Sequence, residues 1–212
     1  MSSGYPTPEG IISSLTELAN KWRLTAVFWH LYFAIFIAAL VFGIRPSKRV
    51  AGLLLALPFL SVSILAFTIF NPVNGVGFAL VGMLLVYVSV KMPREPVQIA
   101  PWWALIAGAF MFVFGWIYPH FLDASSPYSF LYSSPIGVIP CPTLSIGISL
   151  ALIMSSLNSR KVSLILGNAG VIYGLTGVAM LGVTIDLILL FGAIVTLIFA
   201  FVGKDRARRN QE

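Results

Sequence analysis

The side chains that could do chemistry are few in this sequence, and they lie near one end of its apolar segments. The chain has a single cysteine, Cys141, and two histidines, His30 and His120. Asp186 is the one acidic residue within the long apolar segments. Thiol, imidazole and carboxylate groups bind ions and exchange protons, and they are costly to bury in a membrane. Their shared position therefore indicates a site.

Several hydrogen-bonding side chains accompany these groups. We expect an outward-facing pocket for a small solute or ion, lined by Asn71, Tyr118, His120, Cys141, Thr143 and Asp186. Cys141 would be the central contact, and Asp186 would supply a charge or accept a proton. Thr143 and Asn71 would supply hydrogen bonds. The alternative for Asp186 is a cap, in which its carboxylate accepts backbone N–H bonds at the start of a helix.

Two prolines, Pro140 and Pro142, flank Cys141. Proline removes an N–H donor and clashes with the preceding turn, so we expect a helix that is distorted or broken where it starts. Such a break frees backbone carbonyls and can aim a thiol into a cavity. The alternative is a kinked start to the helix, with a buried and inert thiol.

The same residues allow two further hypotheses. A metal site could draw on His30, His120, Cys141 and Asp186, but four separate segments would have to bring them together. An enzyme could use Cys141 as nucleophile and His120 or His30 as base, which requires a thiol–imidazole contact. The sequence has no His-Glu-x-x-His and no Gly-x-Ser-x-Gly motif. We therefore favour a role without catalysis and assign no cofactor.

The composition decides the class of protein. Of the 212 residues, 58% are hydrophobic and only 9% are charged, against about 25% charged in soluble domains. A chain this apolar cannot cover a water-facing surface with polar groups. Soluble enzymes and nucleic-acid-binding modules are therefore excluded despite the net charge of +6, and the lipid bilayer is the expected partner.

We predict an all-α integral membrane protein with seven transmembrane helices, because a helix needs about 20 apolar residues to span the bilayer. The membrane domain, 24–203, follows an N-terminal segment, 1–23, and precedes a basic tail, 204–212. Gly182 is the expected tight turn between the last two spans. The spans are predicted at about 24–44, 50–70, 75–90, 100–118, 138–157, 162–181 and 183–203.

The positions of Lys and Arg predict the orientation, because cytoplasmic loops collect them. With the N-terminus outside and the C-terminus in the cytoplasm, eleven of the 13 basic residues lie inside. Only Lys21 and Arg23 lie outside. We expect a multi-pass protein of the bacterial cytoplasmic (inner) membrane. The functional alternative for the basic residues is an anionic-lipid patch around Arg206, Arg208 and Arg209.

An amphipathic helix is expected ahead of the first span. Thr7 and Pro8 resemble a helix start. Apolar residues then recur at helical spacing from Ile11 to Trp22, with polar residues opposite. We interpret this segment as an anchor in the outer interface rather than as a helix that docks a partner.

Three separated motifs resemble a bacterial family of uncharacterised, strongly hydrophobic membrane proteins known only as a domain of unknown function. The most specific is Gly137-Val138-Ile139-Pro140-Cys141-Pro142-Thr143, similar to the family's Gly-x-x-Pro-Cys-Pro-Thr element. The others are Ile69-Phe70-Asn71-Pro72 with Gly77-Phe78, and Leu181-Gly182-Val183 with Asp186-Leu187. Tyr118-Pro119 matches less closely. The resemblance implies no activity, but it places Asn71, Pro140, Cys141, Pro142, Thr143 and Asp186 in a recurrent pattern.

Together these observations predict binding or transport of a small solute or ion at the outer side of the membrane. The alternative is a non-catalytic structural or accessory subunit that packs against a membrane protein partner or against a second copy of the chain.

Overall fold

The computed structural model describes residues 7–123 and 126–209, with side chains described as far as residue 201. Over these residues it is all-helical and contains no β-strand, which confirms the predicted all-α class. The helices are α1 (Pro8–Lys21), α2 (Arg23–Val41), α3 (Lys48–Thr68), α4 (Pro72–Val90), α5 (Trp102–Trp116), η1 (Pro127–Ser129), α6 (Phe130–Ser133), α7 (Pro140–Ile153), η2 (Ser155–Asn158), α8 (Arg160–Ala179) and α9 (Asp186–Arg209).

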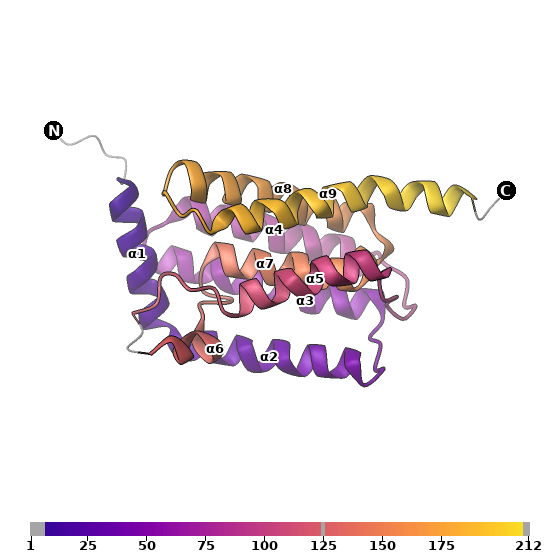
Figure 1. Cartoon of the computed structure of the whole chain (residues 1–212), viewed down its shortest axis with the longest axis horizontal. Coiled ribbons are helices and arrows are strands. Elements are labelled where there is room, and N and C mark those ends of the chain that lie inside the picture. The colour runs from indigo at the N-terminus through magenta and orange to yellow at the C-terminus, as the bar shows by residue number, and fades with distance from the viewer. Residues whose placement is uncertain (1–6, 124–125, 210–212) are drawn as a thin grey trace.

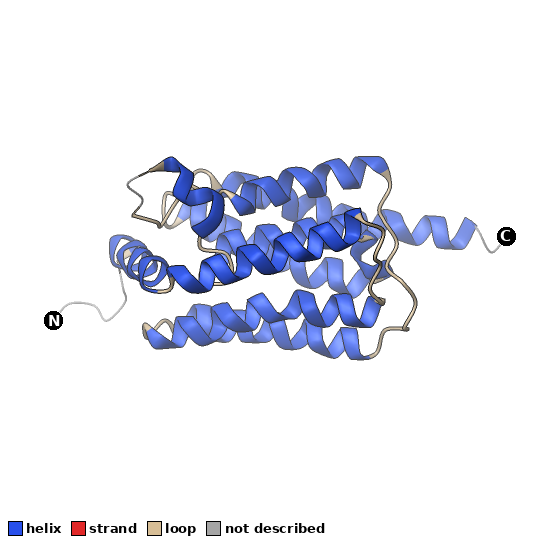
Figure 2. Ribbon diagram, turned by 90° about the horizontal axis from the view of Figure 1, so that it is seen from below, coloured by secondary structure: helices blue, strands red, loops and turns tan. Residues whose placement is uncertain are grey.

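The helices α2, α3, α4, α5, α7, α8 and α9 lie side by side along the long axis of the molecule (Figures 1 and 2). Four of them, α2, α3, α4 and α8, are long and apolar enough to cross a membrane. The helices α5 and α7 are shorter, as is the apolar part of α9, Asp186–Phe201.

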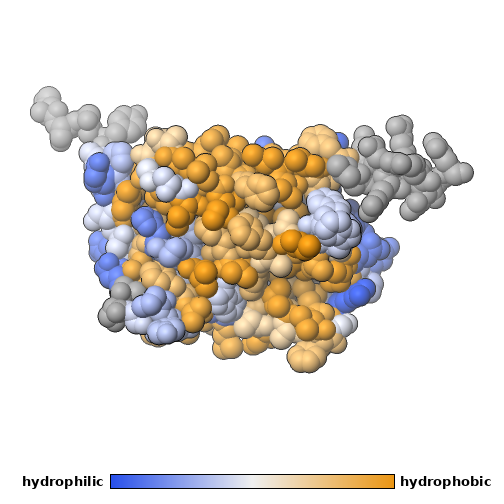
Figure 3. All heavy atoms as spheres, in the orientation of Figure 1, coloured by the Kyte–Doolittle hydropathy of each residue, from blue (hydrophilic) through white to orange (hydrophobic). Residues whose placement is uncertain are grey.

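The surface is divided into an apolar middle and two polar ends. Figure 3 shows a broad area of hydrophobic residues across the middle of the face in view, with hydrophilic residues toward both ends of the molecule. Large apolar side chains are exposed along the helices, among them Phe28, Leu31 and Ile35 on α2. A face of this size is stable only against lipid or another protein, and the pattern is that of a membrane protein.

The centre of the structure is α7, of which every residue is buried. It packs against α5, α8, α9 and α3. The helix is apolar all round, as expected for a helix enclosed on every side. Two of its hydroxyls bond backward to the backbone, Thr143 to the Ile139 carbonyl at 2.7 Å and Ser145 to the Cys141 carbonyl at 2.9 Å. The enclosed helix therefore satisfies these polar groups itself.

Helix starts and turns follow the residue types. Ser47 accepts a hydrogen bond from the Val50 N–H at the start of α3, and Asn71 accepts one from the Asn74 N–H at the start of α4. Gly182, with a φ of +68°, makes the predicted tight turn between α8 and α9. Glycine adopts this left-handed conformation without the steric cost that a side chain brings.

The N-terminal helix α1 lies across the end of the bundle (Figure 1). Thr7 is its N-cap, accepting a hydrogen bond from the Gly10 N–H at 3.2 Å, and Pro8 occupies the first turn. Leu15, Leu18 and Ala19 are buried. The predicted amphipathic helix is therefore present, with its apolar face packed on the protein.

A larger side chain at Gly108 should weaken the contact between α5 and α7. A Cβ at Gly108 would lie 3.0 Å from the Ser149 carbonyl oxygen and 2.8 Å from Ile153, so Gly108→Val forces the two helices apart. Overpacking of this kind costs about 1–3 kcal/mol. We expect a lower melting temperature in detergent, measured by circular dichroism. The control is Ala109→Val, at an exposed position of the same helix, and an equal loss in both variants would contradict this packing.

Candidate functional site

The site is built around the carboxylate of Asp186, the first residue of α9. This side chain is 1% exposed. Its Oδ1 accepts a hydrogen bond from the Tyr118 hydroxyl at 2.8 Å, and its Oδ2 accepts one from the Cys141 thiol at 3.1 Å. The three residues come from three parts of the chain and are here called the carboxylate cluster. Both donors are side chains that lie outside α9. They are not backbone N–H groups at the start of α9, which Asp186 would accept from if it were a helix cap.

Tyr118 follows the end of α5, and aromatic packing holds its ring in place. Phe114 meets it edge-on at 5.5 Å between ring centroids, and Phe121 stacks on it at 6.3 Å. The Ser134 hydroxyl donates to the Tyr118 carbonyl at 3.1 Å. The ring is fully buried, and its hydroxyl finds its acceptor in Asp186, as buried tyrosines usually require.

Cys141 lies in the first turn of α7, directly after Pro140. The helix begins at Pro140, and the preceding residues form a turn around Gly137, whose φ is +69°. Proline in a first turn loses no hydrogen bond, because the N–H there has no partner within the helix. The Pro-Cys-Pro sequence therefore marks a helix start after a turn, not a break within a longer helix, and it directs the thiol toward Asp186.

Gly177 on α8 closes the site from a further side. A Cβ at this position would lie 2.0 Å from Asp186 Oδ2, so only glycine leaves room for the carboxylate. Our sequence reasoning missed this residue. A signal was present, because Gly167, Gly170, Gly174 and Gly177 recur at spacings of three and four along α8, and they face α9 at close range.

The carboxylate has no cationic partner among the described side chains. The two side chains that donate hydrogen bonds to it are a phenol, Tyr118, and a thiol, Cys141. Over residues 7–123 and 126–201, the one ion pair joins Lys48 to Glu95. His120, in the loop after α5, has a buried Nε2 with no hydrogen-bond partner among those residues. An ionised carboxylate buried without compensation is costly.

Two residues predicted to line the pocket are held by local bonds instead. Thr143 accepts a hydrogen bond from the Gly137 N–H at 2.8 Å and donates to the Ile139 carbonyl. It therefore locks the turn that precedes α7. Asn71 caps α4. Within the described part of the chain, no hydrogen bond joins either residue to the carboxylate cluster.

His30 is part of α2 and contacts the end of α5, outside the carboxylate cluster. Its Nδ1 is 2.8 Å from the Ala26 carbonyl and its Nε2 is 3.1 Å from the Trp116 carbonyl. Both partners are acceptors, so a neutral imidazole donates to one of them only. His30 thus ties two helices together, as a buried histidine of a helix bundle is expected to do.

The four candidate metal ligands are not brought together. Among the described residues no group of three His, Cys, Asp or Glu side chains could hold a metal ion. Only Cys141 and Asp186 are in contact. The Cys141 thiol donates to a carboxylate, and within the described chain it makes no hydrogen bond to an imidazole, which the enzyme hypothesis requires.

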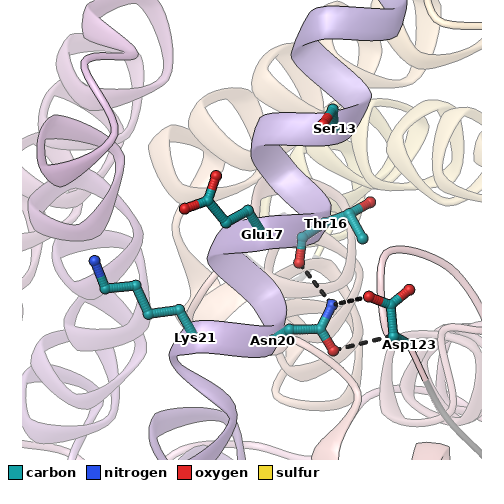
Figure 4. A pocket seen from close by; sticks show the side chains of 6 residues that line it. All are labelled: Ser13, Thr16, Glu17, Asn20, Lys21 and Asp123. Atoms are coloured by element: carbon teal, nitrogen blue, oxygen red, sulfur yellow. Dashed lines mark hydrogen bonds between the residues drawn. The ribbon is translucent and has the colours of Figure 1, made fainter.

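A surface hollow of about 710 Å³ lies outside the cluster, against α1 (Figure 4). Asn20 and Asp123 join there through two hydrogen bonds, at 3.2 Å and 3.1 Å, which fasten α1 to the loop after α5. No member of the carboxylate cluster lines this hollow; its lining residues are Ser13, Thr16, Glu17, Asn20, Lys21 and Asp123. The cluster itself is packed closed, as the burial of its three side chains shows.

No protein-family model, curated protein or solved structure matches this chain. The resemblance of its three motifs to a bacterial family therefore stays a prediction.

A methyl group at Gly177 should loosen Cys141. Gly177→Ala displaces the Asp186 carboxyl group that holds the thiol, and a typical intramolecular hydrogen bond contributes about 0.5–1.5 kcal/mol. We expect alkylation of Cys141, the single cysteine, to become about tenfold faster. The rate is measured by mass spectrometry with N-ethylmaleimide.

The matched control is Ala179→Val, which adds bulk at an exposed position of the same helix. Unchanged alkylation in Gly177→Ala, or equal acceleration in both variants, would show that Asp186 does not restrain the thiol.

Proposed function

We propose that the chain is a seven-span protein of the bacterial cytoplasmic membrane that binds and transports a small solute or ion at its outer end. Asp186 is the proton carrier of this process. The observation that carries the proposal is a buried carboxyl group that receives hydrogen bonds from Tyr118 and Cys141 and has no cation beside it among the described side chains.

The electrostatics favour a bound proton. A carboxyl group in this position is stable when it is neutral or when a cation lies against it. Hard metal cations take six or more oxygen ligands, whereas the cluster supplies one carboxylate, one phenol and one thiol. A proton needs no such ligand shell. Asp186 therefore acts by gaining and losing a proton.

His120 is the proposed contact between Asp186 and the outer surface. Its Nε2 is buried and without a partner among the described residues, and His120 lies two residues after Tyr118, whose hydroxyl donates to Asp186. In the proposed mechanism, displacement of the loop after α5, which carries both His120 and Tyr118, breaks the Tyr118 hydrogen bond to Asp186 and opens the cluster.

The arrangement of the helices agrees with the proposed orientation. The carboxylate cluster lies where α7 and α9 begin. Lys48, Arg160 and Lys161 lie at the opposite end, where α3 and α8 begin. Basic residues collect on the cytoplasmic side, so the cluster faces outward. Seven spans then place α5, α7 and α9 across the bilayer beside the four longer helices.

Protonation of Asp186 can be tested with dicyclohexylcarbodiimide, an apolar reagent that modifies protonated carboxylic acids. We expect modification of Asp186 at pH 7 in membranes, measured by mass spectrometry of peptides. The exposed carboxylates of Glu17 and Asp123 serve as internal controls and should stay unmodified. Asp186→Asn should remove the label. Modification of Asp186 at pH 5 that is lost at pH 7 would contradict a proton bound under neutral conditions.

The orientation can be tested with reporters fused to the chain. A fluorescent protein at the C-terminus should fold in the cytoplasm and fluoresce, because seven spans return the chain to the inside. Alkaline phosphatase fused after Asp123 should be active outside. Phosphatase activity from the C-terminal position would overturn the seven-span topology.

A further inference from the structure

A second cavity, of about 430 Å³, lies at the end of the bundle opposite to the carboxylate cluster. It sits where α3 and α8 begin and α4 ends. We call it the basic cavity. Its lining residues are Lys48, Tyr87, Val88, Lys91, Met92, Pro93, Leu157, Asn158, Ser159, Arg160 and Lys161.

The lining carries four cationic side chains and no acidic one. Lys48 is buried and forms an ion pair with Glu95, which lies outside the lining. Lys91 lies over the ring of Tyr87, and Arg160 lies over the ring of Phe201 at 4.7 Å. Aromatic faces hold these cations without neutralising them. The cavity therefore keeps a strong positive potential.

The backbone adds to this potential. The 20-residue helix α8 begins in the lining, and its N-cap Ser159 makes no side-chain capping hydrogen bond. N–H groups of a first turn have no partner within the helix, and the helix dipole places partial positive charge there. A phosphate group accepts hydrogen bonds from these N–H groups, and the helix dipole stabilises its negative charge. Cationic side chains and a helix start thus converge on one cavity.

An apolar face leads away from the cavity along α4. Tyr87 lines the cavity and is 56% exposed. Leu84, Met83 and Leu80 are exposed on the preceding turns of the same helix, which run toward the apolar middle of the surface. A molecule with a phosphate group in the basic cavity and acyl chains along α4 fits both features.

We propose that the basic cavity binds the phosphate headgroup of an anionic phospholipid of the inner leaflet. Lys91, Arg160 and Lys161 contact the phosphate, and the first turn of α8 donates backbone hydrogen bonds. The exposed face of α4 receives the acyl chains. The basic cavity and the carboxylate cluster lie at opposite ends of the helix bundle. Lipid binding in the cavity is independent of the proposed proton transfer at Asp186.

The test is native mass spectrometry of the full chain released from micelles with phosphatidylglycerol, with phosphatidylcholine, and with inorganic phosphate. We expect retention of phosphatidylglycerol and little retention of phosphatidylcholine. Arg160→Gln/Lys161→Gln should lower the affinity for phosphatidylglycerol about tenfold or more, since each basic residue near a membrane surface contributes about 1 kcal/mol. Lys91→Gln should act in the same direction.

The matched control is Arg94→Gln, which removes an exposed basic residue near the same end but outside the lining. The melting temperature without lipid checks the fold of each variant. Equal losses in Arg94→Gln and in the cavity variants would overturn the proposal, because they indicate diffuse surface charge. Binding of inorganic phosphate without selectivity for phosphatidylglycerol would overturn it in favour of a soluble anion.

Discussion

The enclosure of α7 is the constraint on which the rest of the structure depends. A helix buried on all sides has no solvent to satisfy its polar side chains, so hydrogen bonds to them come from its own backbone or from neighbouring side chains, and Ser149 Oγ is without one. Thr143 and Ser145 bond to the backbone of their own helix. The Cys141 thiol, in the buried first turn of that helix, donates to Asp186 instead. The Tyr118 hydroxyl donates to the other oxygen of Asp186. Gly177 has no Cβ and so leaves space for the Asp186 carboxyl group.

Much of the helical organisation could be predicted from the sequence, because hydropathy marks each apolar segment and Ser, Asn and Gly mark its ends. One helix ends earlier than the apolar segment that contains it. The apolar run predicted at 138–157 holds a helix that stops at Ile153, since Ser155–Asn158 follow with positive φ angles of 51° to 56°. None of these four residues is a glycine, so the sequence gives no signal that predicts this turn. Tertiary contacts with α3 and α8 hold this segment.

The candidate site could be predicted only in part. Orienting the segments placed Cys141, Asp186 and Tyr118 at one end, and these three are in contact. Asn71 and Thr143 were predicted on the same grounds, yet they cap a helix and lock a turn. The same oxygen and amide groups that bind ligands also satisfy backbone ends, so residue type alone could not separate the two roles. Gly177 has no functional side chain. Its role depends on its close approach to the Asp186 carboxyl group, which only the three-dimensional structure shows.

The central claim is that Asp186 carries a proton in the closed bundle at neutral pH. Infrared difference spectroscopy between the wild-type protein and Asp186→Asn in lipid tests it most directly, because a protonated carboxylic acid has a C=O stretching band distinct from carboxylate bands. We expect the wild-type protein to show this band at pH 7 and the variant to lack it. A difference spectrum with carboxylate bands alone would show an ionised Asp186 and contradict the account.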